Sequence, residues 1–291
     1  MRKFGRLLGC LSLLMSVCVG ASELPSYVKM DFKQATIDAK ANNKNVLIVF
    51  STVWCGPCKV MASDVYPLKE VQEGLSSYEF VYVDAEKSSD LAAKYKIDGF
   101  PTFVVLDKDL VELGRFASAV TNPSEFLAEV EKARSAPERK AQQAAKLSEL
   151  DKQIQVSPSA SLYSERAELK ISMEQYEAAL EDFKKGAALD KDNKLHLQGN
   201  VLYMDAALNN GNDPKKMLEA CEQVVTEYQN CSYAVMARYN LVQIYGNFIK
   251  DNKKAEMHAR AFIKDYPTHP AVGDVQHMIL HFTGEEHEEP H

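Results

Sequence analysis

Two cysteines separated by two residues are the most reactive group in this 291-residue sequence. Cys55 and Cys58 belong to the hexapeptide WCGPCK at residues 54–59, directly after an apolar run and at the expected start of a helix. Unpaired backbone N–H groups and the helix dipole favour a thiolate at a helix N-terminus, which lowers the pKa of the first cysteine. The spacing brings Cys58 round one helical turn, where it can attack a mixed disulfide formed at Cys55. We therefore predict a redox-active dithiol in which Cys55 attacks and Cys58 resolves.

Two other uses of a CxxC pair fit this sequence less well. A zinc site requires two further ligands, and no second CxxC or HxxxH lies in the same region. A purely structural disulfide across a two-residue loop would constrain the unfolded chain little. His277 and His281 could share one face of the last predicted helix, but a solvated helix end is the simpler interpretation. We expect neither a metal site nor a cofactor.

The hydrophobic pattern predicts the elements that position the two cysteines. Residues 46–50 are a continuous apolar run, which indicates a strand buried on both faces, and a helix should run from Gly56 to about Val65. The other predicted elements are strands 80–83, 102–106 and 111–116, and helices 32–41, 68–75, 89–95 and one that begins after Asn122. Strands that alternate with helices predict an α/β domain over residues 22–134.

Two motifs together resemble the thioredoxin superfamily over roughly residues 30–134. One is WCGPCK and the other is GFPT at residues 99–102. The resemblance implies a thioredoxin fold in which Pro101 is a cis-proline opposite the cysteines and keeps metals away from them. It also implies that Phe100 faces the substrate chain. The residues to which the resemblance assigns substrate positioning are Trp54, Gly56, Pro57, Phe100 and Pro101.

The sequence departs from the family's pattern beneath the active site. Val49, six residues before Cys55, stands where classical thioredoxins carry a buried acid that helps to deprotonate the resolving thiol. Phe80 or a near neighbour stands where those proteins carry a lysine. A water or another carboxylate must then accept the proton of Cys58. The departure makes the chain look more like the exported, disulfide-interchange branch of the superfamily.

After residue 134 the pattern becomes entirely helical. Residues 135–156 are predicted to form a helical linker, and residues 157–283 an all-α array of helical repeats. Residues 162–193 resemble a tetratricopeptide repeat, because the preferred positions carry Tyr163, Ala167, Tyr176, Ala179, Phe183 and Gly186. Such arrays bind proteins or peptides on a concave face. The alternatives are that the array packs against the redox domain or mediates dimerisation.

Two further cysteines lie in this helical region. Cys221 and Cys231 are ten residues apart, across the end of one predicted helix and the start of the next. In an oxidising compartment a structural disulfide between them is one interpretation. The other is two buried thiols that pack as small hydrophobic side chains.

The N-terminus predicts the compartment. Residues 1–21 combine positive charges, an apolar stretch and small residues at the end, which is the layout of a cleaved signal peptide. We therefore expect an exported, periplasmic protein, soluble once cleaved, with a disordered tail at residues 284–291. A formal net charge of −7 disfavours nucleic acid as a partner.

These observations predict an exported thiol–disulfide oxidoreductase. The Gly-Pro spacer is typical of reducing members, so we expect reduction of disulfides in exported proteins, with electrons from a membrane donor and a partner docked on the repeats. The alternatives are a disulfide oxidase or isomerase, and a protein-binding assembly module with a vestigial redox pair. The missing acid at Val49 favours the last alternative.

Overall fold

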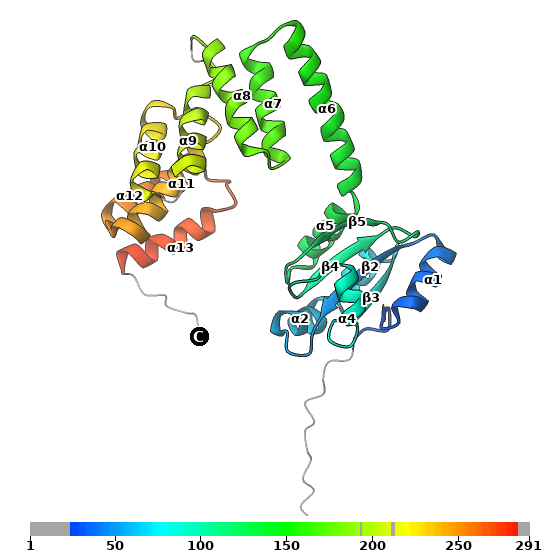
Figure 1. Cartoon of the computed structure of the whole chain (residues 1–291). Coiled ribbons are helices and arrows are strands. Elements are labelled where there is room, and N and C mark those ends of the chain that lie inside the picture. Colours follow the sequence, from blue (N-terminus) through cyan, green and yellow to red (C-terminus); the bar gives the residue numbers. More distant parts are fainter. Residues whose placement is uncertain (1–23, 193, 211–212, 285–291) are drawn as a thin grey trace, which may run out of the picture. The chain divides into compact units, whose positions relative to one another are not determined.

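The computed structural model of the chain describes residues 24–192, 194–210 and 213–284 (Figure 1). It divides into two compact units, Met1–Lys140 and Ala141–His291. The predicted signal peptide and all of the predicted tail except Gly284 lie outside the described residues.

The first unit is built on one five-stranded sheet with helices on both faces (Figure 1). Its elements are β1 Val28–Lys29, α1 Phe32–Asn42, β2 Asn45–Ser51, α2 Gly56–Val60, η1 Met61–Val65, α3 Lys69–Gly74, β3 Tyr78–Asp84, α4 Ser89–Lys94, β4 Thr102–Leu106, β5 Glu112–Phe116 and α5 Pro123–Arg134. The strand order is β1-β3-β2-β4-β5, with β1, β3 and β2 parallel and with β4 and β5 antiparallel to their neighbours. This sheet confirms the predicted α/β thioredoxin fold.

Side chains of the central strands alternate between two apolar layers, as the period of a strand requires. Leu47 and Val49 of β2 pack in one layer with residues of η1, α3 and α5. Val46, Ile48 and Phe50 pack in the other layer with residues of α1 and with residues from the segment around α4. Burial on both faces explains why this strand reads as an unbroken apolar run.

The helix after the cysteines differs from the regular helix that the sequence predicts. It is α-helical only over α2 and continues as the π-helix η1, where the N–H of Tyr66 donates to the carbonyl of Met61, five residues earlier, at 3.0 Å. The wider turn keeps Met61, Val65 and Tyr66 fully buried against the sheet.

The second unit is entirely helical across the residues that the structure describes there. Its elements are α6 Ala136–Val156, which begins in the first unit, α7 Ala160–Ser172, α8 Tyr176–Leu189, α9 Leu197–Asn210, α10 Pro214–Glu227, α11 Ala234–Gln243, η2 Ile244–Ile249, α12 Asn252–Asp265 and α13 Val272–Thr283. From α7 to α13 consecutive helices pack against one another, and this confirms the predicted helical region after the redox domain. Within the described part of the chain, no helix has the length and apolar character required to cross a membrane.

Small residues allow α7 and α8 to approach closely. Ala167 and Ala179 are fully buried. A β-carbon at Gly186 would stand 3.3 Å from Cβ of Tyr163 and 2.8 Å from a methyl group of Leu197. These are the positions at which the sequence predicts small residues.

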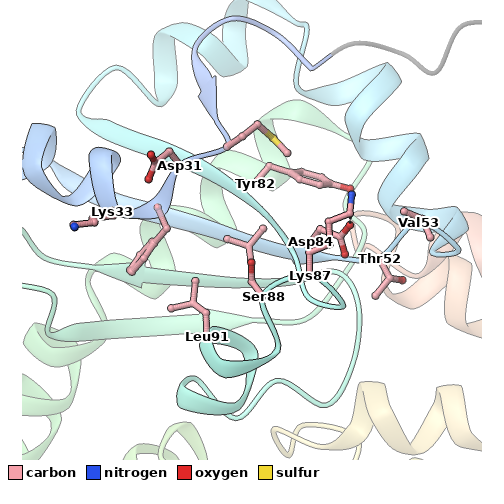
Figure 2. A pocket seen from close by; sticks show the side chains of 12 residues that line it. Asp31, Lys33, Thr52, Val53, Tyr82, Asp84, Lys87, Ser88 and Leu91 are labelled. Carbon is pink, nitrogen blue, oxygen red and sulfur yellow. Dashed lines mark ion pairs between the residues drawn. The ribbon is translucent and has the colours of Figure 1, made fainter.

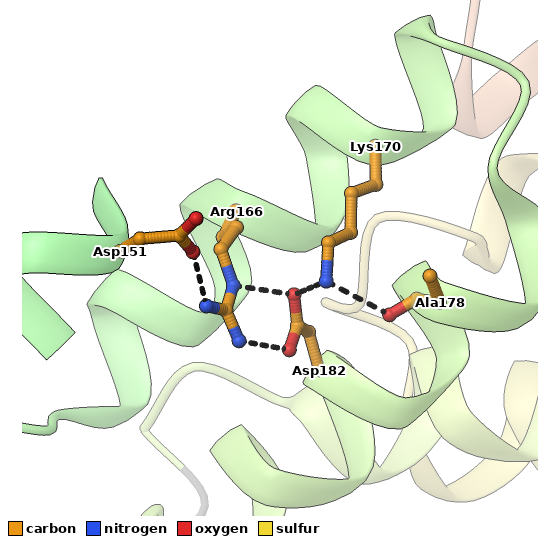
Figure 3. A network of polar contacts seen from close by, with 5 residues as sticks. All are labelled: Asp151, Arg166, Lys170, Ala178 and Asp182. Atoms are coloured by element: carbon orange, nitrogen blue, oxygen red, sulfur yellow. Dashed lines mark hydrogen bonds and ion pairs between the residues drawn. The ribbon is translucent and has the colours of Figure 1, made fainter. Parts of the chain in front are cut away.

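An ion cluster centred on the buried side chain of Asp182 joins α6, α7 and α8 (Figure 3). Asp182 accepts hydrogen bonds from the guanidinium of Arg166 at 2.6 and 2.8 Å, and from the ammonium of Lys170 at 2.6 Å. Arg166 also donates to Asp151 of α6 at 2.6 Å. The cluster thus ties the predicted linker helix to the first helical pair.

The disulfide considered for Cys221 and Cys231 is not formed: both are free, buried thiols. Cys221 lies inside α10, six residues before its end, which is about 9 Å along the helix axis. Cys231 lies in the turn beyond α10 and faces Gly199 of α9, whose β-carbon position is 2.8 Å from the Cys231 sulfur. Both side chains instead fill the apolar core of the helical unit.

Candidate active site

The reactive pair stands where β2 leads into α2. Strand β2 ends at Ser51, and Cys55 is the N-cap of α2, where its backbone is extended. The Sγ of Cys55 accepts the N–H of Cys58 at 3.2 Å. The two cysteines are joined as a disulfide with their Cα atoms 5.3 Å apart. A backbone N–H aimed at Cys55 Sγ, at a helix N-terminus, is the geometry that stabilises a thiolate once the bond is reduced.

Exposure differs sharply between the cysteines and the residues that surround them. Cys55 is 4% exposed and Cys58 is 1% exposed, whereas Trp54 is 65% exposed. Gly56 and Pro57 are also exposed. A partner disulfide can therefore approach over Trp54 and the Gly-Pro spacer, while Cys58 is shielded beneath them.

The second predicted motif lies beside the first. The Phe100–Pro101 peptide bond is cis, as predicted. The rings of Trp54 and Phe100 meet edge to face with their centroids 5.7 Å apart, and Thr102 Oγ1 closes the loop by donating to the carbonyl of Gly99 at 2.7 Å. The structure thus brings the cysteine loop and the cis-proline loop together, while the substrate-positioning roles of these residues stay predictions.

Strand pairing identifies the residue beside Val49. The register of β2 and β3 pairs Val49 with Tyr82, two residues beyond Phe80, the position to which the family resemblance assigns the lysine. The hydroxyl of Tyr82 donates to Ser51 Oγ at 2.7 Å, and Ser51 is fully buried. Neither hydroxyl was predicted, because their contact depends on the register between strands that lie about thirty residues apart in sequence.

A groove of about 780 Å³ opens beside the end of β3 (Figure 2). It forms because β1 pairs with β3 only at Phe80 and Val81 in the described structure, so the last residues of β3 border the segment after β1. Its lining includes Thr52, Tyr82, Asp84 and Lys87, and the last two form an ion pair at 3.2 Å.

Glu86 is a further residue of the site that no sequence motif indicates. Its carboxylate accepts the indole N–H of Trp54 at 3.1 Å. This bond holds the exposed indole in place. Glu86 belongs to no predicted motif and lies 32 residues from Trp54 in the sequence, so only the fold reveals the contact. Trp54 is therefore fixed both by a carboxylate and by the ring of Phe100.

Comparisons with known proteins agree with this geometry. The family model for the thioredoxin-like domain matches residues 32–134 of the sequence. The chain is 36% identical over 99 residues to the chloroplastic thioredoxin Y1 of Arabidopsis thaliana, covering 32% of this chain and 55% of that protein. It is 34% identical over 95 residues to thioredoxin H7 of the same plant, covering 33% of this chain and 69% of that protein.

Among solved structures, a thioredoxin from Nicotiana alata aligns with 26% identity and a TM-score of 0.33, covering 40% of this chain and 99% of that one. The chain thus spans little more than half the length of the chloroplastic relative and about two thirds of thioredoxin H7. With its dithiol at the end of β2 and a cis-proline loop beside it, the chain belongs, through residues 32–134, to the thioredoxin family.

Proposed function

We propose that this protein is an exported thiol–disulfide oxidoreductase that reduces disulfides in exported proteins. The observation that carries the proposal is the Cys55–Cys58 disulfide at the N-terminus of α2, with the N–H of Cys58 directed at Cys55 Sγ. Reduction of a client begins with attack by the Cys55 thiolate on the client disulfide. Cys58 then attacks the mixed disulfide, which releases the reduced client and restores the bond seen here.

The proposal extends to compartment, electron supply and partners. The composition of residues 1–21 supports export to the periplasm. A reductase outside the cytoplasm needs reducing equivalents, for which a membrane electron donor is the natural source. Helices α7 to α12 pack in consecutive pairs, and this arrangement supports docking of a protein partner on the helical unit.

Activity is tested by reduction of insulin with dithiothreitol as the electron source, comparing the wild-type chain with Cys55→Ser. Serine is a good N-cap residue, so this substitution removes the nucleophile but keeps the cap on α2. We expect activity to fall to the uncatalysed background while the circular dichroism spectrum stays unchanged. Full activity in Cys55→Ser would instead support the assembly module with a vestigial pair.

The direction of electron flow, from the protein to its clients or the reverse, is tested by the reduction potential of the Cys55–Cys58 pair. Trp54 is the single tryptophan of the chain and lies next to Cys55, so its fluorescence should report the state of the pair during equilibration with glutathione or dithiothreitol buffers. A potential below about −240 mV is expected for a reductase. A value above about −200 mV would assign the protein to the oxidases or isomerases.

Clients are tested with Cys58→Ser, which lacks the resolving thiol and should hold clients as mixed disulfides at Cys55. Chemical cross-linking of these trapped complexes should connect the clients to α7–α12 if the helical unit docks them. Cross-links confined to the first unit would contradict docking on the repeats without affecting the proposed redox activity.

A further inference from the structure

The resolving step poses a proton problem at Cys58. The thiolate is the nucleophile in disulfide exchange, so Cys58 must lose a proton before it attacks the mixed disulfide. Cys58 is 1% exposed, and an apolar environment disfavours a thiolate. Val49, on the strand beneath the helix, has no polar side-chain atom to accept the proton. The proton therefore needs a route from a buried site to water.

Two hydroxyl groups lie on the face of the sheet that carries α2. Val49 packs in the same apolar layer as Met61, three residues after Cys58 on the continuous α2–η1 helix. Ser51 shares this face because it is two residues beyond Val49, and Tyr82 reaches it from the adjacent strand, with 2.7 Å between Tyr82 Oη and Ser51 Oγ. Ser51 is also the last residue of β2, at the start of the loop that ends in Cys55.

The hydrogen of the Ser51 hydroxyl is weakly held in this oxidised state. Its described acceptor is the carbonyl of Thr52 at 3.5 Å, at the limit of a hydrogen bond. In the disulfide, Cys58 has no S–H to donate. The Ser51 hydroxyl can therefore reorient when the reduced Cys58 presents its proton.

Tyr82 connects this buried hydroxyl to the groove. Its side chain is half-buried and lines the groove together with Thr52 (Figure 2). Thr52 is 3% exposed, and its Oγ1 has no hydrogen-bond partner in the described structure. Buried polar atoms are nearly always satisfied by protein or by water, so this orphaned hydroxyl marks a position for a water at the groove end of the path.

We propose that Ser51 and Tyr82 relay the proton of Cys58 to water in the groove. Cys58 Sγ–H gives its proton to Ser51 Oγ. The two hydroxyls reverse the hydrogen bond that Tyr82 donates to Ser51 in the oxidised state, so that the Ser51 proton passes to Tyr82 Oη and the Tyr82 proton passes to a groove water. Both hydroxyls are thereby restored. The Cys58 thiolate then forms a bond to Cys55 Sγ as the Cys55–client bond breaks and the electron pair leaves on the client sulfur. When a donor reduces the disulfide, the same path returns a proton to Cys58.

Charged groups at the groove set the environment of the relay. Asp84 and its ion-pair partner Lys87 line the groove beside Tyr82, and Asp31 and Lys33 contribute from the segment after β1 and from α1. Tyr66 lies on the interior side, where burial raises its pKa far above the ordinary value, so it stays protonated. Two carboxylates and two ammonium groups thus line the groove into which Tyr82 opens.

The inference rests on the proposed redox function, and the experiment separates the two. Reduced protein that lacks residues 1–21, and with them Cys10 and Cys18, is mixed with dithiobis(nitrobenzoate) in a stopped-flow instrument from pH 5 to pH 9. The first release of nitrothiobenzoate reports attack by Cys55, and the second reports attack by Cys58 on the mixed disulfide. For Tyr82→Phe we expect an unchanged first release, a second release slower by about tenfold near neutral pH, and a pH midpoint of the second release raised by about one unit.

Matched variants distinguish a relay from a packing effect. Tyr78→Phe removes a hydroxyl from the same face of β3, about 13 Å along the strand from Tyr82, and should leave both releases as in the wild type. Ser51→Ala should resemble Tyr82→Phe, Ser51→Thr should restore the rate, and the Ser51→Ala, Tyr82→Phe double variant should be no slower than either single variant. Equal pH profiles for Tyr82→Phe and Tyr78→Phe would overturn the relay. A wild-type protein that shows no second release would contradict the redox function itself.

Discussion

Cys221 and Cys231 show how burial determines the chemistry of single residues. Both lie in the apolar core of the helical unit. Burial, followed by the nearby charge of Glu222, raises the pKa of the Cys221 thiol to about 12, and burial also raises the pKa of Cys231. Thiols that stay protonated and enclosed are poor nucleophiles. They thus contrast with Cys55, whose Sγ lies at a helix N-terminus and accepts the N–H of Cys58.

We therefore predict that Cys221 and Cys231 do not react in the folded protein. In oxidised protein that lacks residues 1–21, dithiobis(nitrobenzoate) at pH 8 should detect no fast thiol, and two thiols should appear after unfolding in urea. Oxidised Cys221→Ser protein provides the control, since it should show one thiol after unfolding. Rapid labelling of two thiols in native buffer would show that this core opens easily.

The β5–α5 contact illustrates packing at the scale of elements. A β-carbon at Gly114 of β5 would lie 2.4 Å from the backbone carbonyl oxygen of Ala133 in α5. Backbone atoms cannot move aside as the end of a side chain can, so Gly114→Ala should destabilise the first unit by about 1–3 kcal/mol. Urea unfolding followed by Trp54 fluorescence measures this loss. Gly56→Ala, at a position with no atom within 4 Å of the new methyl group, should not lower stability.

The ion cluster of α6, α7 and α8 gives a pH-dependent contribution to stability. Burial alone raises the pKa of the Asp182 carboxyl, but hydrogen bonds from Arg166 and Lys170 outweigh burial and hold the pKa below its ordinary value. A carboxyl group with a lowered folded-state pKa stabilises the fold above its unfolded pKa, about 3.9, and loses this contribution as pH falls through the folded-state value. The free energy of unfolding of the helical unit should therefore decline below about pH 4.

Asp182→Asn removes the carboxylate that pairs with two partly buried cations, Arg166 and Lys170. The Asp182 side chain is only 2% exposed, so we expect a loss of about 3 kcal/mol at pH 7 and a weaker dependence on pH below 4. Circular dichroism at 222 nm during urea unfolding measures both. Glu181→Gln, next to it on α8, breaks a pair with Lys184 in which Glu181 is 62% exposed and should cost less than about 1 kcal/mol. Similar losses in both variants would mean that the cluster adds no stability.

Patterns within single segments predicted most of the elements, whereas contacts between segments could not be predicted. The strand at residues 46–50 was predictable because burial on both faces leaves an unbroken apolar run. The π-helix η1 was not, because side-chain periodicity does not reveal which carbonyl an N–H selects. The Tyr82–Ser51 hydrogen bond could be predicted only from the register of β2 and β3. The free thiol of Cys221 could be predicted only from the path of the chain after α10.

At the scale of the whole molecule, the two units should unfold independently. Each hydrophobic cluster of buried residues lies within one unit, either before Lys140 or after Ala141. Cooperativity depends on a shared core, so disruption of one core need not disrupt the other. Trp54 reports the first unit alone, while most of the helical signal at 222 nm comes from the second.

Gly114→Ala and Asp182→Asn provide a crossed test of this independence. Gly114→Ala should lower the urea midpoint of Trp54 fluorescence and leave the main transition at 222 nm in place, whereas Asp182→Asn should do the reverse. The combined variant should show both shifts unchanged, because substitutions without shared partners are additive. A fluorescence midpoint that moves with Asp182→Asn would instead show that α6, which spans Ala136–Val156, transmits unfolding from one unit to the other. In that case binding of a partner to the helical unit could alter the stability of the fold around Cys55 and Cys58, a coupling that independent units cannot have.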